Sequence, residues 1–208
     1  MGLAASPAGK RIAVLASGRG SNFQALIDAV RAGSIPGIIA RLITDNPEAF
    51  AIQRAEEAGI QVSILAFGSY PAKEDYEAAL KSEMEDCDAD LFVLAGYMRI
   101  LPAAIVKAFP GRIMNIHPAL LPSFPGLHAQ RQALEYGVKV SGCTVHFVDE
   151  GTDTGPTIIQ RCVPVQEGDD EESLSARILV EEHRILADAV RLFCQGKIRL
   201  FGRKVTIR

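Results

Sequence analysis

Short apolar runs alternate with segments of helical pattern along this chain, and that alternation limits the possible folds more than any other feature. The run 12–16 ends in glycines, as a buried parallel strand does, and 21–32 then has the pattern of a helix. The succession continues, with strands expected at 38–43, 61–66 and 90–95 and helices at 48–58 and 73–85. Repeated strand–helix–strand units predict a mostly parallel sheet with helices on both faces.

The pattern changes after a short fifth strand expected at 112–116. Segments 141–148 and 157–165 have the pattern of longer strands, and their connection is too short for a crossover helix, so they should pair antiparallel. A helix at 171–194 and a terminal strand or hairpin within 197–207 complete the chain. The predicted fold class is therefore α/β, an open, mostly parallel mixed sheet with an antiparallel C-terminal part.

Length and composition predict a single domain. The 208 residues contain no Pro- or Ser-rich linker, so we expect one domain at 10–208 after a disordered leader at 1–9, which has no secretory pattern. Four widely spaced cysteines without a C-x-x-C pair favour reduced thiols in the cytoplasm. No apolar run approaches the roughly 20 residues that span a bilayer. A net charge of -3 leaves no broad basic field, so neither membrane nor nucleic acid is expected as a partner.

The first candidate site is the segment Ser-Gly-Arg-Gly-Ser-Asn at 17–22, between the first strand and the first helix. Glycines there let backbone N–H groups point outward at a helix N-terminus, where an anion binds well. A tight turn with Ser21 as the helix cap is the structural alternative. A dinucleotide motif would need glycine in place of Phe23, so a single phosphate fits better.

The second candidate site is the strand end at Asn115 and His117. Residues two apart on a strand share one face, so these side chains point to the same side while Ile116 points into the core. Pro118 stops the strand there, at the edge of an open α/β sheet where ligands collect. An amide beside an imidazole suits acyl chemistry, in which Asn115 holds a developing oxyanion and His117 donates or relays a proton.

Two acidic features complete the set of candidates. A carboxylate from the Gly- and Asp-rich loop 149–156 could orient His117 and favour its charged form. Glu182 falls inside the apolar stripe of the last helix, so it should have a buried partner, either an amine-bearing ligand or a structural arginine. The other three histidines share no metal-ligand spacing with His117, so no metal site is predicted.

Taken together, these residues resemble the family of glycinamide ribonucleotide formyltransferases. The match runs from about Arg11 to the end of the last helix, and its most specific stretches are 18–22, 94–101, 115–122, 125–128 and 145–156. The resemblance implies a Rossmann-like formyltransferase fold. It also implies transfer of a formyl group from 10-formyltetrahydrofolate to the amine of glycinamide ribonucleotide, in de novo purine biosynthesis, by a cytoplasmic monomer or homodimer.

The resemblance also implies roles for individual residues. The catalytic residues would be Asn115, His117 and Asp153. The ribonucleotide would be held by Gly20, Ser21, Asn22, Leu179 and Glu182. The folate would be held by Lys73, Met98, Arg99, Ile100, Leu101, Asn115, Asp149, Glu150, Gly151, Thr152 and Asp153. Two positions depart from the family pattern, because Lys73 stands where arginine is frequent and Leu179 where a polar residue is frequent.

The mechanism expected from these residues is direct transfer. The amine attacks the formyl carbon, Asn115 and protonated His117 stabilise the tetrahedral oxyanion, and Asp153 keeps His117 charged. A methionyl-tRNA formyltransferase would carry a further C-terminal domain and a basic surface, and neither is expected here. Two alternative functions remain. One is a formyltetrahydrofolate hydrolase, a class of enzyme that usually adds an N-terminal regulatory domain. The other is a non-catalytic nucleotide- or folate-binding protein.

Overall fold

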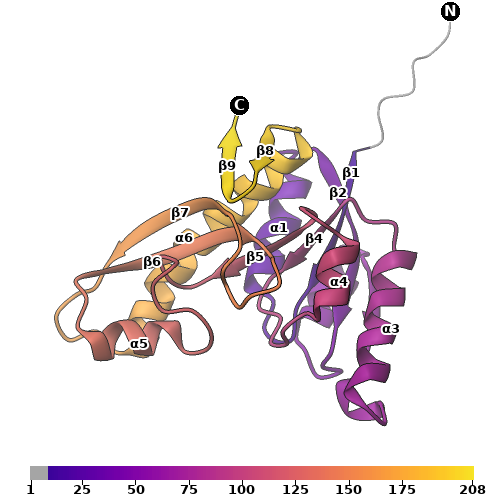
Figure 1. The fold of residues 1–208 in the computed structure, drawn as a ribbon, viewed down its shortest axis with the longest axis horizontal. Helices are drawn as coiled ribbons and strands as arrows, with labels where there is room; N and C mark the ends of the chain where they lie inside the picture. Colours follow the sequence, from indigo (N-terminus) through magenta and orange to yellow (C-terminus); the bar gives the residue numbers. More distant parts are fainter. Residues whose placement is uncertain (1–8) are drawn as a thin grey trace, which may run out of the picture.

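A seven-stranded sheet forms the centre of the computed structural model, which describes residues 9–208 (Figure 1). Its strand order is β3-β2-β1-β4-β5-β6-β7. The strands are β1 (Lys10–Leu15), β2 (Gly37–Thr44), β3 (Gln61–Ile64), β4 (Leu91–Leu94), β5 (Ile113–His117), β6 (Val140–Phe147) and β7 (Thr157–Pro164). Strands β1 to β5 pair in parallel, and β6 pairs antiparallel with both β5 and β7. The predicted mixed sheet is confirmed.

Alternating side chains of the central strands enter two separate cores. In β1, Ile12 and Val14 belong to one apolar cluster, and Ala13 and Leu15 belong to the other. The first cluster is covered by α1 (Ser21–Arg31), α2 (Ala51–Ala58) and α6 (Glu171–Cys194). The second is covered by α3 (Lys73–Asp86) and α4 (Ala103–Ala108), on the opposite face (Figure 1). Burial on both faces explains why these strands are continuous apolar runs.

Several boundaries differ from the sequence prediction. Helix α2 begins at Ala51 rather than at residue 48, because the Asn46 side chain accepts the backbone N–H of Glu48 at 2.9 Å and holds a turn there. Helices α4 and α5 (Ala129–Tyr136) and the 3-10 turn η1 (Phe67–Ser69) were not predicted, since six, eight and three residues are too short for a clear period.

The C-terminal elements agree with the prediction. Helix α6 has the predicted bounds because the Asp170 side chain accepts the N–H of Ser173 at 2.8 Å, a capping box that fixes its first turn. The terminal segment is a hairpin of β8 (Ile198–Phe201) and β9 (Lys204–Ile207). The predicted leader at 1–9 lies, except for Gly9, outside the described residues, and the single domain at 10–208 stays a prediction.

The direction in which successive strands are added to the sheet changes between β1 and β4. Strands β2 and β3 are added on one side of β1, and β4 to β7 on the other. The loops after β1 and β4 therefore meet, and they are joined by hydrogen bonds of 3.0 Å from Ser17 N to Gly96 O and from Met98 N to Ser17 Oγ. A crevice at such a switch point is where open α/β sheets bind ligands.

Candidate active site

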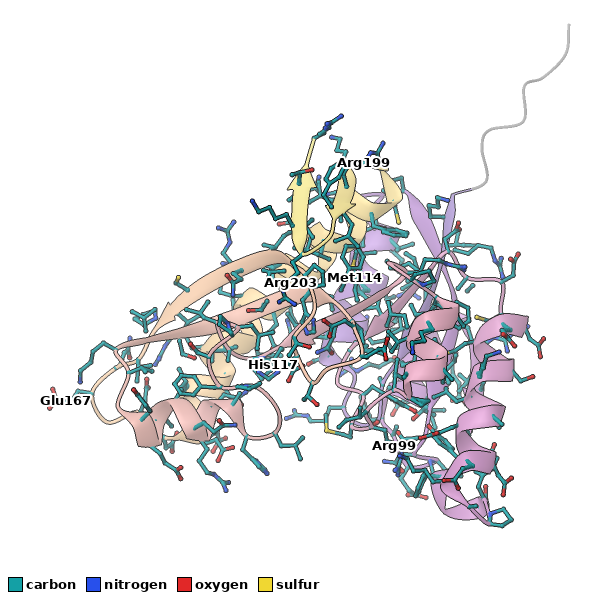
Figure 2. The ribbon with its side chains drawn as sticks, viewed as in Figure 1. Arg99, Met114, His117, Glu167, Arg199 and Arg203 are labelled. Carbon is teal, nitrogen blue, oxygen red and sulfur yellow. The ribbon has the colours of Figure 1, made fainter. Side chains whose placement is uncertain are left out.

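Asn115, His117 and Asp153 lie together, as the sequence predicted. Asn115 and His117 lie on the same face of β5, and Ile116 packs into the apolar cluster on the other face. The Asp153 carboxylate contacts both side chains: Oδ1 accepts Asn115 Nδ2 at 3.4 Å, and Oδ2 lies 3.4 Å from His117 Nδ1. Figure 2 shows His117 near the middle of the molecule. The catalytic roles of these residues stay proposals.

The His117 ring is buried between two acceptors. Its side chain is 5% exposed, and Nε2 lies 2.8 Å from the Phe124 carbonyl, which cannot donate, so we assign a hydrogen to Nε2. Burial lowers the pKa of His117, and the Phe124 carbonyl and Asp153 offset this in part. Burial therefore opposes the expected effect of Asp153 on the charge of His117, and that expectation stays a prediction.

Asp153 is held in a demanding backbone conformation. Its φ of 54° lies in the left-handed region, and its Oδ2 accepts the backbone N–H of Gly126 at 2.8 Å. Burial raises the pKa of Asp153, but the neighbouring His146, the hydrogen bond from the Gly126 N–H and the neighbouring His117 outweigh burial and leave that pKa below its usual value. Strained residues of this kind persist where the surroundings fix them, often at functional sites.

His146 is a member of this cluster that the sequence analysis missed. It stands opposite Asn115 in the β5–β6 ladder, and its Nε2 lies 3.2 Å from Asn115 Nδ2. Because its Nδ1 faces the Phe147 carbonyl at 2.9 Å, Nδ1 carries the hydrogen and Nε2 accepts from Asn115. His146 thus orients the Asn115 amide. The sequence signal for His146 was the alternating pattern of the strand expected at 141–148. The antiparallel register was also needed to place His146 opposite Asn115.

The predicted anion site lies at the start of α1. Gly20 is the N-cap residue, with φ 68°, and Ser21 is the first helical residue, so the alternative of Ser21 as the cap is wrong. The freed N–H groups of this first turn suit an anion. Asn22 Nδ2 donates to Glu182 Oε2 at 2.8 Å, and Asn22 Oδ1 is buried without a hydrogen-bond partner among residues 9–208.

Glu182 is buried, as its place in the apolar stripe predicted, but its partner is Asn22 rather than an arginine. Burial raises the pKa of Glu182, and the Asn22 hydrogen bond offsets this in part. The contact ties α6 to the loop 20–22. Leu179, one turn earlier on α6, is half-buried. These residues form one region, although no contact tests their assigned binding roles.

Two basic side chains beside this region were not predicted. Arg54 Nε donates to the Arg19 carbonyl at 2.9 Å, so its guanidinium lies next to the loop 17–22. His183 follows Glu182 on α6, and its Nε2 is buried without a hydrogen-bond partner among residues 9–208. Burial lowers the pKa of His183, and the charge of Arg54 lowers it further. Nothing in the local sequence distinguishes Arg54 from the other arginines on helix surfaces.

Four of the predicted folate residues line a separate cavity of about 330 Å³. Lys73, Met98, Arg99 and Ile100 line it, with Met98 65% and Ile100 74% exposed. Arg99 is held by Asp45 at 2.7 Å and stacks 3.5 Å from the centre of the Phe67 ring. Figure 2 shows Arg99 beside α3, away from His117.

The remaining folate residues do not line this cavity. Leu101 is buried in the second apolar cluster. Within residues 9–208, the lining of the cavity includes no residue of the loop 149–153. That loop lies over α4 instead, where Glu150 pairs with Lys107 at 3.2 Å, while the Asp149 carboxylate accepts the N–H of Gly151 and the hydroxyl of Thr154. The structure thus divides the predicted folate site into two groups.

Residues 9–208 contain neither a metal-binding cluster nor a helix suited to cross a membrane. No three His, Cys, Asp or Glu side chains in this range are arranged to hold a metal ion, and the prediction of no metal stays untested. None of the helices in the same range has the length and apolar character needed to cross a bilayer.

Comparisons with known proteins agree on one family. The family model described as formyl transferase matches residues 10–190. Phosphoribosylglycinamide formyltransferase of Escherichia coli (strain K12) is 42% identical over 189 residues, which cover 91% of this chain and 89% of that protein. The crystal structure of glycinamide ribonucleotide transformylase 1 from Symbiobacterium toebii has a TM-score of 0.93 and 51% identity, over 96% of this chain and 94% of that one.

A longer relative matches as well. The trifunctional purine biosynthetic protein adenosine-3 of Drosophila melanogaster is 48% identical over 189 residues, which are 90% of this chain but 14% of the relative. The resemblance inferred from the sequence motifs is confirmed. The chain belongs to the formyl transferase family, on the branch of the phosphoribosylglycinamide formyltransferases.

Proposed function

We propose that this protein transfers a formyl group from 10-formyltetrahydrofolate to the primary amine of glycinamide ribonucleotide, in purine biosynthesis. The observation that carries the proposal is the buried cluster of Asn115, His117 and Asp153 at the carboxyl end of β5. An amide donor, an imidazole and a carboxylate in contact supply what an acyl transfer to an amine needs, namely an oxyanion donor and a proton carrier.

His117 and Asp153 carry the proton as a pair. In the resting site the neutral ring presents the lone pair of Nδ1 toward the carboxylate, and the two groups attract each other once they share one proton. When the amine attacks the formyl carbon, the pair takes up the proton that the amine nitrogen loses. The pair then gives that proton to the departing folate nitrogen, so the pair ends the cycle as it began. A lowered His117 pKa suits this role, because the ring starts as an acceptor.

Asn115 stabilises the oxyanion of the tetrahedral intermediate. Its Nδ2 has two hydrogens, one directed at His146 at 3.2 Å and one at Asp153 at 3.4 Å. The longer bond is the weaker one, and it is the one exchanged for the oxyanion. His146 keeps the amide in orientation during this exchange.

The ribonucleotide is bound between α1 and α6. The backbone N–H groups of Gly20, Ser21 and Asn22 hold its phosphate at the helix N-terminus, and Arg54 adds a positive charge beside it. Glu182, fixed by Asn22, contacts the amine-bearing end of the substrate. Leu179 contributes apolar contact at this site.

The folate is bound along the loop after β4. The exposed apolar side chains of Met98 and Ile100 at a cavity of about 330 Å³ fit a flat, partly apolar ligand, and Lys73 supplies a charge for its acidic tail. The loop 149–153 closes the cleft on the side of Asp153. We place the enzyme in the cytoplasm as a monomer or homodimer without a nucleic-acid partner. Free Cys87, Cys143, Cys162 and Cys194 support that compartment.

The test is an assay with both substrates. We expect formyl transfer that requires glycinamide ribonucleotide and falls by about 100- to 1000-fold in kcat for Asn115→Ala and His117→Ala, while both ligands still bind by calorimetry. The matched control is Arg184→Ala, on the exposed side of α6, which should keep full activity. Release of formate without the ribonucleotide would assign a hydrolase instead, and tight binding without turnover would assign a binding protein.

A further inference from the structure

The loop that carries Asp153 approaches His117 from an unusual direction. Strand β6 runs antiparallel to β5 and ends at Phe147, opposite Met114, whereas His117 stands at the other end of β5. The chain after β6 must therefore return along the face of the sheet before Asp153 can reach the His117 ring. Sheet hydrogen bonds do not fix such a return, so the loop depends on other anchors.

The internal anchors of the loop flank Asp153 in the chain. Asp149 binds the N–H of Gly151 at 3.2 Å and the hydroxyl of Thr154 at 2.6 Å. Gly155 lies so close to Phe147 that a Cβ would stand 1.7 Å from its carbonyl oxygen. These contacts fix the conformation of the loop itself. The distance between the loop and the sheet depends on contacts with residues outside the loop.

The terminal hairpin supplies a further outside contact, in addition to the Gly126 N–H that binds Asp153 and the Lys107 side chain that pairs with Glu150. Its tip is the two-residue turn Gly202–Arg203, with φ 57° at Gly202, and Ile198 and Val205 on its strands pack against the first apolar cluster. From this tip, Arg203 Nη2 donates to the Thr154 carbonyl at 2.7 Å, and Nη1 lies 4.0 Å from Asp149 Oδ2. Figure 2 shows the β8–β9 hairpin with Arg199 and Arg203 labelled.

We infer that Arg203 is a positioning residue: from the terminal hairpin it holds the Thr154 carbonyl and so keeps the neighbouring Asp153 carboxylate against His117. The inference rests on the proposed function for its effect on turnover, but the contact between Asp153 and His117 can be observed without it. Arg203 touches neither Asp153 nor His117 and acts through the backbone of Thr154.

The test compares three variants of the full chain. Arg203→Met keeps the stem but removes the donors, Arg203→Lys keeps one charged donor, and Arg199→Met is the control. Arg199 is on the same hairpin and donates to the carbonyls of Gly196 and Ile198 rather than to the loop. We expect Arg203→Met to lower kcat about 5-fold, the effect of one exposed charged hydrogen bond, with unchanged KM for the ribonucleotide. Arg203→Lys should recover part of this loss, and Arg199→Met should match wild type.

The His117 pKa, measured by NMR, distinguishes a loss of Asp153 positioning from the loss of the Arg203 charge itself. The groups facing the ring are Asp153, which raises its pKa, and His146, which lowers it. Removing a nearby positive charge would by itself raise the His117 pKa, whereas loosening Asp153 lowers it. We expect a lower pKa in Arg203→Met. An unchanged or raised pKa, or a kcat equal to that of Arg199→Met, overturns the inference. If wild type shows no formyl transfer, the proposed function fails, and the pKa comparison still decides the role of Arg203.

Discussion

In the proposed mechanism His117 and Asp153 share one proton, and both side chains are needed to hold it. The Phe124 carbonyl fixes the hydrogen on Nε2, which leaves Nδ1 facing the carboxylate at 3.4 Å. Burial disfavours the charged ring, whereas the Phe124 carbonyl and the Asp153 carboxylate both favour it. The proposed mechanism therefore requires the negative charge of residue 153 and not merely its shape.

Asp153→Asn tests that requirement. Asparagine tolerates the left-handed φ of 54°, so the variant removes the charge without new strain. We expect the His117 pKa to fall below its already lowered wild-type value, with kcat reduced by about 100-fold at pH 7.5 and no recovery as the pH decreases, because the ring must start as a proton acceptor. NMR titration of the ring with a pH–rate profile measures both. An unchanged pKa would show that Asp153 acts through position alone.

Glu182→Gln tests the buried carboxyl of α6. Because burial raises the folded-state pKa of Glu182 above 4.5, ionisation at higher pH favours the unfolded chain. Glutamine keeps an acceptor for Asn22 but carries no charge, so the variant should gain Tm relative to wild type, and the gain should grow as the pH rises from about 4.5 to 8. The neighbouring Glu181→Gln serves as control, since Glu181 pairs with exposed Arg184. Parallel Tm curves for Glu182→Gln and wild type would contradict the argument.

At this scale the sequence predicted the strand-end residues but not their partners. Asn115 and His117 follow from period-two alternation and Pro118, which are local signals. His146 escaped because antiparallel register decides which residue stands opposite Asn115. Asn22 as the partner of Glu182 escaped because the pair is 160 residues apart. The balance of burial against charge at His117 needed the packed structure.

Among the elements, the start of α1 depends on a glycine for two reasons. Gly20 has φ 68°, and a Cβ there would lie 2.8 Å from the Ala51 Cβ at the start of α2. The turn thus sets the distance between the two helices as well as the direction of the N–H groups. Local signals found this turn, and the Asp170 capping box fixed α6, whereas the short α4 and α5 have too few residues for a periodic pattern.

Gly20→Ala should therefore lower the free energy of unfolding by more than the left-handed backbone strain alone would. The control is Gly33→Ala, which has φ 70° and no atom within 4 Å of its Cβ position, so it carries the left-handed penalty alone. We expect Gly20→Ala to lower the free energy of unfolding by about 1–3 kcal/mol more than the control, because it crowds α2. Its KM for the ribonucleotide should also rise, while folate binding stays unchanged. Equal denaturation midpoints and KM values for the two variants would contradict this account.

For the whole molecule, the proposed ribonucleotide site joins two helices that are distant in the sequence. Helix α1 follows the first strand, α6 follows the seventh, and both pack on the same apolar cluster. The sheet pattern predicted this layering, because buried parallel strands need helices on both faces. The separation of the folate residues into a cavity by α3 and a loop by α4 could not be predicted, since the return of the chain after β6 depends on tertiary contacts.

A ligand that bridges α1 and α6 should stabilise the whole fold. At 100 times its Kd, glycinamide ribonucleotide contributes about 2.7 kcal/mol, which for a chain of this size raises Tm by about 5–10 °C. Thermal unfolding monitored with and without the ligand measures the shift. The control is the dephosphorylated glycinamide riboside at the same concentration, which should give a much smaller shift. Equal shifts would show that the loop 20–22 does not hold the phosphate.

The contact between Asn22 and Glu182 also has a consequence for synthesis on the ribosome. The two residues are 160 positions apart, and at about 5–20 residues per second they are made roughly 8–32 s apart. During that interval a nascent chain has the turn at Gly20 but lacks the carboxylate that orients the Asn22 amide. Under the proposed function, competence to bind the ribonucleotide arrives with α6, after every strand of the main sheet has been translated. Under the same proposal, a chain released before α6 is made should not bind the ribonucleotide, because no carboxylate yet holds its Asn22 amide.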